Sequence, residues 1–483
     1  MSVHSLKIYR MILLIVLLGI LIPTLALLPF IRPLADDIAQ PVTVVKTWRE
    51  TGSITQTVKA AIDATINIYL ERNGTFFAMF LSVVPFSIFH DRLLALNGLL
   101  SIVLLLASMY RLAYCLQYVC RDVSQETVHC LALLLSILTF LLMPNYFESI
   151  YWFSAACGYV YVFALSIFLF SAVLKALLKG SLPTWKFVAL CAGFFCLGGG
   201  NWINSTSSIV SFAGIALLAL LMRKNTKILV IGLFLLLGYM IAVLCPGNSY
   251  RMTVLGEKRG LFSALVCSFL SAGKYLFSDA RIWLLSVFML PILVDAARRS
   301  VLSFRYPLLL AACSVCILAA GYFPMIYTNY DIMPRHINTI HMILVVLLPV
   351  NLFYTAGWLL RKCPMRIPAW LKSRRIMALV CVLVLLMTGV FSFDAPKISA
   401  CTLEPAQALI HWIDGHSRYY ADYYDSVVQA ILDNPDGDIT INWIVNDRMV
   451  NPTVYIYEDP EFWVNSSFAH YYGNEGCTIR YTP

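Results

Sequence analysis

The stretch MILLIVLLGILIPTLALLPF, from Met11 to Phe30, contains no charged residue and decides the class of the fold. About 20 apolar residues are enough for a helix to cross the hydrocarbon core of a bilayer. The run is long for the apolar part of a signal peptide, and no small-x-small cleavage site follows it directly. It therefore predicts an uncleaved first transmembrane helix, with Lys7 and Arg10 holding the N-terminus in the cytoplasm.

The rest of the chain has the same character. Of its 483 residues, 60% are hydrophobic and only 13% are charged, which a soluble domain of this length would not show. Long apolar runs do not suit a transmembrane β-barrel, whose strands are short and alternate. The net charge of +9 comes from short basic clusters between apolar runs, which membrane topology explains better than nucleic-acid binding. We expect an all-α polytopic membrane protein.

Ten further apolar runs predict spans, which gives about eleven in all. The run Thr75–Phe89 is short for a crossing, and we expect it to be interfacial or re-entrant. No span is predicted between Leu244 and Ile282. The ten predicted spans are Leu93–Tyr110, Val128–Met143, Trp152–Leu174, Trp185–Gly199, Ser205–Leu221, Ile228–Leu244, Ile282–Val294, Leu308–Ile326, Ile337–Leu360 and Ile376–Phe391.

The basic residues decide the orientation. If Thr75–Phe89 does not cross, every short basic loop falls on one side, which the positive-inside rule assigns to the cytoplasm. These loops contain Arg111 and Arg121, Lys175 and Lys179, Arg223 to Lys227, Arg298 to Arg305, and Arg361 to Arg375. The N-terminus then lies inside and the C-terminus outside, with a first outer loop of about residues 32–92.

Residues 394–483 differ from the transmembrane part, residues 1–393, because they are rich in Tyr, Trp, Asp and Asn. We expect a small α/β appendage on the outer side, with helices at Ala406–Ile413 and Tyr420–Leu432 and a strand at Asp438–Val445. In an oxidising compartment, Cys401 and Cys477 would either form a disulfide or remain free.

Two acidic segments fall on the predicted outer side. Asp36 and Asp37 follow the first span, and either one caps a helix beginning near Ile38 or a carboxylate acts there as general base or metal ligand. Glu148 stands close to Tyr151 and Trp152. It is either an interfacial residue in an aromatic belt, or part of a sugar site in which rings stack and the carboxylate accepts hydroxyl hydrogen bonds.

Two loops on the same side present arginine. The first loop, Pro246 to Arg251, includes Asn248. It either forms a turn that places Arg251 at the lipid headgroups or binds a phosphate through the planar guanidinium of Arg251. The second loop, Asp331 to His336, offers the same two alternatives for Arg335. Its His336 either binds a ligand or is an ordinary interfacial residue. Asn73 and Asn201 belong to the same set of outer polar segments.

Together these segments resemble the GT-C superfamily of polytopic glycosyltransferases, which use polyprenyl-phosphate-linked sugars. Within it, the chain is similar to a bacterial group and, in size and layout, to serotype-converting O-antigen glucosyltransferases. One element departs from the group: its Trp-Asn-Gly-Arg motif is Arg72-Asn-Gly-Thr75 here, so its Arg is lost or replaced by Arg72. The matching segments are Asp36-Asp37, Asn73-Gly74, Glu148 to Trp152, Pro246 to Arg251, Met333 to Arg335, and Trp463 to Tyr472.

The resemblance implies inverting transfer from an undecaprenyl-phosphate sugar to a cell-envelope glycan, such as lipopolysaccharide O-antigen, at the periplasmic face of a bacterial inner membrane. Asp36, or less favourably Asp37, would be the base. The pair would also offer oxygen ligands to Mg²⁺ or Mn²⁺, which some members of the superfamily need and others do not. Arg335 and Arg251 would stabilise the leaving phosphate, and Glu148, Tyr151 and Trp152 would hold sugar.

Other functions remain open at this stage. An O-antigen polymerase or ligase handles similar lipid-linked sugars on the same face. A transporter of lipid-linked sugars would show charged residues or broken helices within the membrane. For a transferase we expect one outer-face cavity that contains Asp36, Glu148 and Arg335 and opens sideways to lipid.

Overall fold

The computed structural model describes residues 3–180, 182–221, 227–255, 257–362, 403–434, 438–441, 444–453, 456–472 and 478–481. The predicted span Ile376–Phe391 and the cysteines Cys401 and Cys477 lie outside these ranges, so the last predicted crossing and the disulfide stay predictions. The side chain of Arg251 is also outside the described part.

The described chain is a bundle of apolar helices, and eight of its helical stretches are long and apolar enough to cross a membrane. This confirms the polytopic, predominantly helical class, while the total of eleven spans stays a prediction. The eight stretches contain α1 (Val3–Ala26), α6 (Leu94–Tyr114), α10 (Val162–Lys179), α12 (Trp202–Leu221), α15 (Leu261–Ser278), α16 (Ala280–Ser286) with α17 (Leu290–Arg298), α18 (Pro307–Tyr327) and α19 (Pro334–Lys362).

Shorter apolar helices complete the bundle. Three of them, α8 (Gln125–Leu141), α11 (Thr184–Gly198) and α13 (Lys227–Val243), coincide with predicted spans. The segment expected to be interfacial or re-entrant contains α5 (Phe76–Ser82), too short to cross a bilayer.

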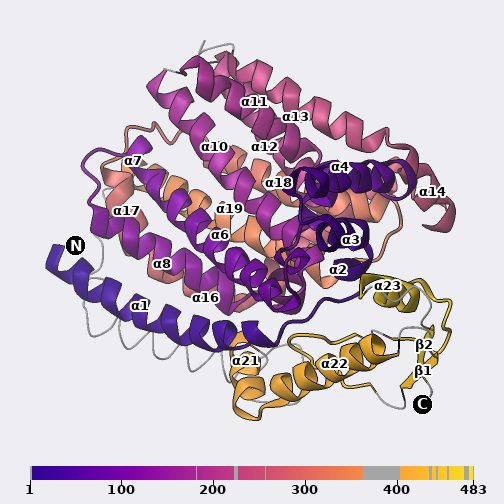
Figure 1. Cartoon of the computed structure of the whole chain (residues 1–483). Helices are drawn as coiled ribbons and strands as arrows, with labels where there is room; N and C mark the ends of the chain where they lie inside the picture. The colour runs from indigo at the N-terminus through magenta and orange to yellow at the C-terminus, as the bar shows by residue number, and fades with distance from the viewer. Residues whose placement is uncertain are drawn as a thin grey trace.

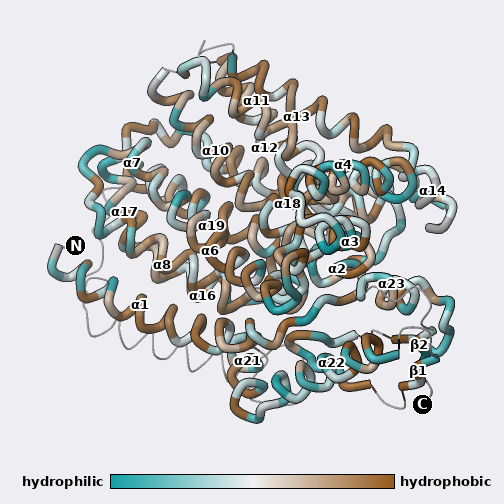
Figure 2. The backbone as a smooth tube through the Cα atoms, in the orientation of Figure 1, coloured by the Kyte–Doolittle hydropathy of each residue, from teal (hydrophilic) through white to brown (hydrophobic). Residues whose placement is uncertain are grey.

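The two ends of the bundle differ in character. Figure 1 shows the N-terminus, α7 (Leu116–Val119) and α17 at one end, and the first outer loop at the other. That loop contains α2 (Asp36–Ala39), α3 (Val42–Thr51) and α4 (Ile54–Glu71), and α14 (Pro246–Leu255) packs against α4. Hydrophobic residues dominate the long helices, and hydrophilic ones concentrate in the outer loop and the C-terminal helices (Figure 2).

Small residues allow neighbouring helices to approach closely. A Cβ atom on Gly238 of α13 would lie 2.1 Å from the carbonyl oxygen of Phe195 in α11. A Cβ on Gly198 would lie 2.4 Å from the carbonyl oxygen of Leu235. Only glycine permits such backbone contact, which is how many membrane helices gain packing energy.

One helix, α15, is missing from the sequence prediction. Its apolar face is open, with Phe262 80% and Leu270 68% exposed, while its other face packs on α18. The helix is hard to predict from the sequence because Lys274 interrupts its apolar run and charged residues lie close to both of its ends. The sequence predicted no span between Leu244 and Ile282, and this prediction was wrong because the apolar helix α15 lies there.

The extra helix does not change the predicted sides of the later loops. At the start of α15, the amide of Arg259 donates to the carbonyl of Tyr327 at the far end of α18 (3.0 Å). At the end of α17, the carbonyl of Arg299 accepts from the amide of Arg121 (2.9 Å). The chain therefore enters α15 at one end of the bundle and leaves α17 at the other.

The C-terminal appendage has the predicted α/β composition. Helices α21 (Glu404–Ile413) and α22 (His416–Asp433) cover the two predicted helices, and the predicted strand begins with β1 (Asp438–Ile441). β1 pairs in parallel with β2 (Thr478–Tyr481), with Asp438 opposite Thr478. Helix α23 (Trp463–Tyr471) packs on α2 and α3, so the appendage contacts the first outer loop.

Candidate functional site

An irregular segment at the outer end of the bundle joins the predicted site residues. Phe147–Tyr151 and Cys157–Tyr161 form π-helical turns, η4 and η5, on either side of the short helix α9 (Phe153–Ala156). A π-turn contains one extra residue and occurs frequently at functional sites. We call Phe147–Tyr161 the π-segment.

Asp37 is fully buried against this segment. One of its carboxylate oxygens accepts hydrogen bonds from the backbone amide (2.8 Å) and the hydroxyl of Ser154. Its other oxygen, Oδ2, has no hydrogen-bond partner. Burial raises the pKa of Asp37 to about 7, although the bonds from Ser154 lower it. This carboxyl group therefore titrates near neutral pH.

The backbone just before the acid pair is strained. Ala35 has φ 41° and ψ −104°, a conformation that a residue with a Cβ rarely adopts. Ala35 is also the N-cap of α2, and neither Asp caps the helix from that position. The capping interpretation of Asp36 and Asp37 was therefore wrong. Both residues lie in the first turn of α2, where negative charge is favoured.

Asp36 has different surroundings from Asp37. Its side chain is 29% exposed, and its Oδ1 lies 3.9 Å from the guanidinium of Arg72. The same guanidinium stands 6.0 Å from the ring centre of Trp463 in the appendage. Arg72 therefore lies between Asp36 and α23.

Glu148 and Arg335 form an ion pair. The carboxylate of Glu148 accepts from the backbone amide of Arg335 (2.7 Å) and from its guanidinium (3.3 Å). The guanidinium lies 5.5 Å from the ring centre of Trp152, which stacks on Phe147. The indole nitrogen of Trp152 is buried and has no hydrogen-bond partner. The site therefore contains two buried polar atoms without a hydrogen-bond partner in the protein, Asp37 Oδ2 and the indole nitrogen of Trp152.

His336 joins the same cluster. Its Nδ1 accepts from the amide of Met333 (3.0 Å), so its Nε2 carries the proton and faces the hydroxyl of Tyr159 at 3.1 Å. Tyr159 also hydrogen-bonds the side chain of Arg335. Ser154 and Tyr159 were not predicted as site residues. The signal that could have found them is a pair of polar side chains within the apolar run Trp152–Leu174.

Four predicted residues use their polar atoms to hold the protein together. Asn201 donates to the carbonyl of Gly158 (2.7 Å), and the hydroxyl of the buried Tyr151 donates to Thr24 (3.2 Å). The side-chain oxygen of Asn248 accepts from Gly74 (3.1 Å), and that of Asn73 accepts from Thr75 (3.2 Å). These hydrogen bonds fix the backbone around the site, and the role of the four residues in binding substrate stays a prediction.

The residues do not assemble a metal centre. Across the described ranges, no three His, Cys, Asp or Glu side chains come together as metal ligands. One oxygen of Asp37 is already occupied by Ser154. Metal binding by the acid pair therefore stays a prediction, and we derive no step through a metal.

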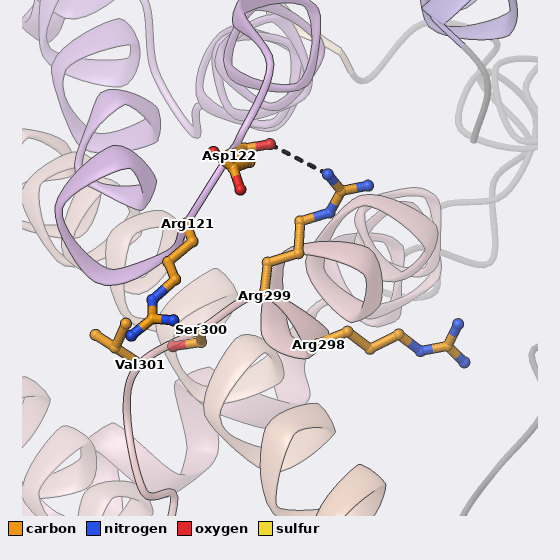
Figure 3. A pocket seen from close by; sticks show the side chains of 6 residues that line it. All are labelled: Arg121, Asp122, Arg298, Arg299, Ser300 and Val301. Atoms are coloured by element: carbon orange, nitrogen blue, oxygen red, sulfur yellow. Dashed lines mark hydrogen bonds between the residues drawn. The ribbon is translucent and has the colours of Figure 1, made fainter.

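The outer-face cavity expected for a transferase stays a prediction. A cleft with a volume of about 520 Å³ lies at the opposite end of the bundle, beside Arg121 and Arg299 (Figure 3). At the outer end, the side chains of Glu148 and Arg335 are only 12% and 19% exposed, and Asp37 is fully buried. The structure is therefore closed around the candidate site.

Comparison with known proteins identified no similar protein. No protein-family model matches the chain, and no curated protein or solved structure matches it either.

Proposed function

We propose that this protein is an inverting glycosyltransferase that moves a sugar from polyprenyl phosphate to a glycan acceptor on the outer face of the membrane. One observation carries the proposal: a buried carboxyl, an arginine and an aromatic ring converge on the π-segment at the outer end of an apolar bundle. These are Asp37, Arg335 and Trp152. The resemblance to the GT-C superfamily agrees with this chemistry.

Asp37 is the better candidate for the general base. A base works best when its pKa lies near the working pH, and the pKa of Asp37 is about 7. Its free Oδ2 has no partner within the protein. A small movement of α2 would expose this oxygen, and the strain at Ala35 favours such a movement. The preference for Asp36 over Asp37 drawn from the sequence is thus reversed in our proposal.

The proposed reaction is a single displacement. Asp37 takes the proton of an acceptor hydroxyl, whose oxygen forms a bond to the anomeric carbon while the bond from that carbon to the phosphate oxygen breaks. Polyprenyl phosphate leaves, and Arg335 stabilises the negative charge that develops on it. Trp152 offers its unpartnered indole N–H to a sugar hydroxyl, and the apolar helices offer a surface for the lipid tail.

The finer assignment follows the topology. The basic loops predict that the site lies on the non-cytoplasmic side of the membrane. The resemblance implies a bacterial inner membrane, with the site on the periplasmic face and lipopolysaccharide O-antigen as the proposed acceptor. One observation favours the transporter alternative instead. Asp279 and Arg281 form an ion pair (2.8 Å) at the break between two apolar helices, where transporters often carry charge.

Transfer of label tests the proposal. Membranes that contain the protein would be incubated with undecaprenyl-phosphate sugars labelled in the sugar, and label in envelope glycan would be measured. We expect transfer from one donor, and a loss of about 100-fold or more for Arg335→Gln. The matched control is Arg92→Gln, an exposed outer arginine, which should keep wild-type transfer. Transfer from none of the donors by correctly inserted protein would contradict the proposal.

A further inference from the structure

The cleft at the basic end of the bundle has a rigid floor. Two segments form an antiparallel bridge between Cys120 and Ser300. Three hydrogen bonds lock them: from the amide of Arg121 to Arg299 (2.9 Å), from the amide of Val301 to Val119 (3.0 Å), and from the hydroxyl of Ser300 to Val119 (2.9 Å). These bonds fix the relative position of the two segments that form the floor of the cleft.

Positive charge dominates its lining. Arg121, Arg298 and Arg299 line it, against one acid, Asp122. Arg299 is held by Asp295 (3.2 Å) and by the carbonyl of Asp122 (3.1 Å). In the part of the chain that the structure describes, no carboxylate pairs with Arg121. Figure 3 shows the Arg121 and Arg299 side chains extending from the two segments, with Arg298 reaching outward.

The surroundings correspond to the level of lipid headgroups. Tyr114 and Tyr118, just before the bridge, each lie 5.6 Å from the guanidinium of Arg111. Lys175 lies 5.8 Å from the ring centre of Tyr118. Tyrosines mixed with basic residues at the ends of apolar helices are typical of the membrane–water interface. Phosphate is the anion concentrated at this level.

We propose that this cleft binds the phosphate group of an anionic phospholipid. The positive-inside rule explains the sign of the charge, but it requires neither a cleft of about 520 Å³ nor a fixed floor beneath it. Arginine suits the ligand because its planar fork donates two parallel hydrogen bonds to phosphate oxygens. In this proposal Arg121 makes the principal contact with the phosphate, Arg299 makes a second contact, and Arg298 lies at the edge of the cleft. The proposal does not depend on the proposed transferase activity.

Lipid binding to the purified full-length protein tests this site. Native mass spectrometry would measure adducts with phosphatidylglycerol, phosphatidylcholine and inorganic phosphate. We expect phosphatidylglycerol to bind more tightly than phosphatidylcholine, and its affinity to fall about tenfold or more in the Arg121→Gln/Arg298→Gln variant. The control Lys186→Gln removes a charge of another helix and should bind as the wild type does.

Three results would overturn the proposal. They are equal binding of the two lipids, unchanged binding by the double variant, and binding of inorganic phosphate as tight as that of lipid, which would indicate a free-phosphate site. If the double variant does not fold, Arg121→Lys serves in its place. That variant keeps the charge but loses the fork, so it should bind phosphatidylglycerol several-fold more weakly.

Discussion

At the residue scale, Asp37 makes stability depend on pH. Its folded-state pKa of about 7 exceeds the ordinary value of 3.8, so between these values the folded protein binds more protons than the unfolded chain. Its contribution to stability is full below about pH 4 and is lost as pH rises through about 7. The free energy of unfolding should fall by up to about 4 kcal/mol across this window.

The matched variant is Asp37→Asn, which keeps the shape and cannot titrate. Thermal midpoints of both proteins in detergent, taken in steps from pH 4 to pH 8, give the comparison. The midpoint of the wild type relative to the variant should decline with pH and level off above about 7. A constant difference over the whole range would show that Asp37 is not held in a desolvated place.

The sequence predicted which residues gather at the site better than it predicted their roles. Glu148 and Arg335 were chosen separately from two outer loops, and they form an ion pair. Ser154 and Tyr159 could not be placed from a regular period, because a π-turn shifts every later side chain around the helix. The difference between Asp36 and Asp37 depends on burial, which identical neighbouring residues do not reveal.

At the scale of the element, α15 should face lipid. A nitroxide label on a cysteine at Leu270 should be relaxed by oxygen and protected from a water-soluble nickel complex, because that side chain is exposed on an apolar face. The matched control is a label at Gln429 on the polar face of α22, which should show the opposite accessibility. The background would have its other reactive cysteines replaced. Relaxation of the Leu270 label by nickel would place α15 in water instead.

The failure to predict α15 has a physical cause. A search for long apolar runs finds helices that are apolar on every face. Helix α15 is not of this kind, because it packs small residues on α18 and contains Lys274. Helices such as α6 and α18, by contrast, are continuous apolar runs whose existence does not depend on their neighbours. The structure was required only to locate the exact ends of these helices and the irregular π-segment.

At the scale of the whole molecule, an ion pair between a buried arginine and a partly exposed aspartate ties the appendage to the bundle. Arg32 is 5% exposed, and its guanidinium makes two bonds to Asp425 of α22, at 2.6 and 2.8 Å. Asp425→Asn should cost about 1–3 kcal/mol, because it leaves the buried arginine without its counter-charge. Limited proteolysis should then cut the appendage faster.

Arg448→Gln is the control for that variant. Arg448 lies 3.9 Å from Glu404, but its side chain is 61% exposed, so the loss of this pair should hardly change the cleavage rate. Equal cleavage of the wild type and both variants would mean that the appendage is held without the Arg32–Asp425 pair.

The central claim is that the buried Asp37, not the exposed Asp36, is the base of a sugar transfer. The most direct test is the rate of sugar transfer by Asp37→Asn and by Asp36→Asn, compared in membranes with equal amounts of inserted protein. We expect a loss of about 100-fold or more for Asp37→Asn and of less than about tenfold for Asp36→Asn. Transfer by Asp37→Asn at the wild-type rate would contradict it.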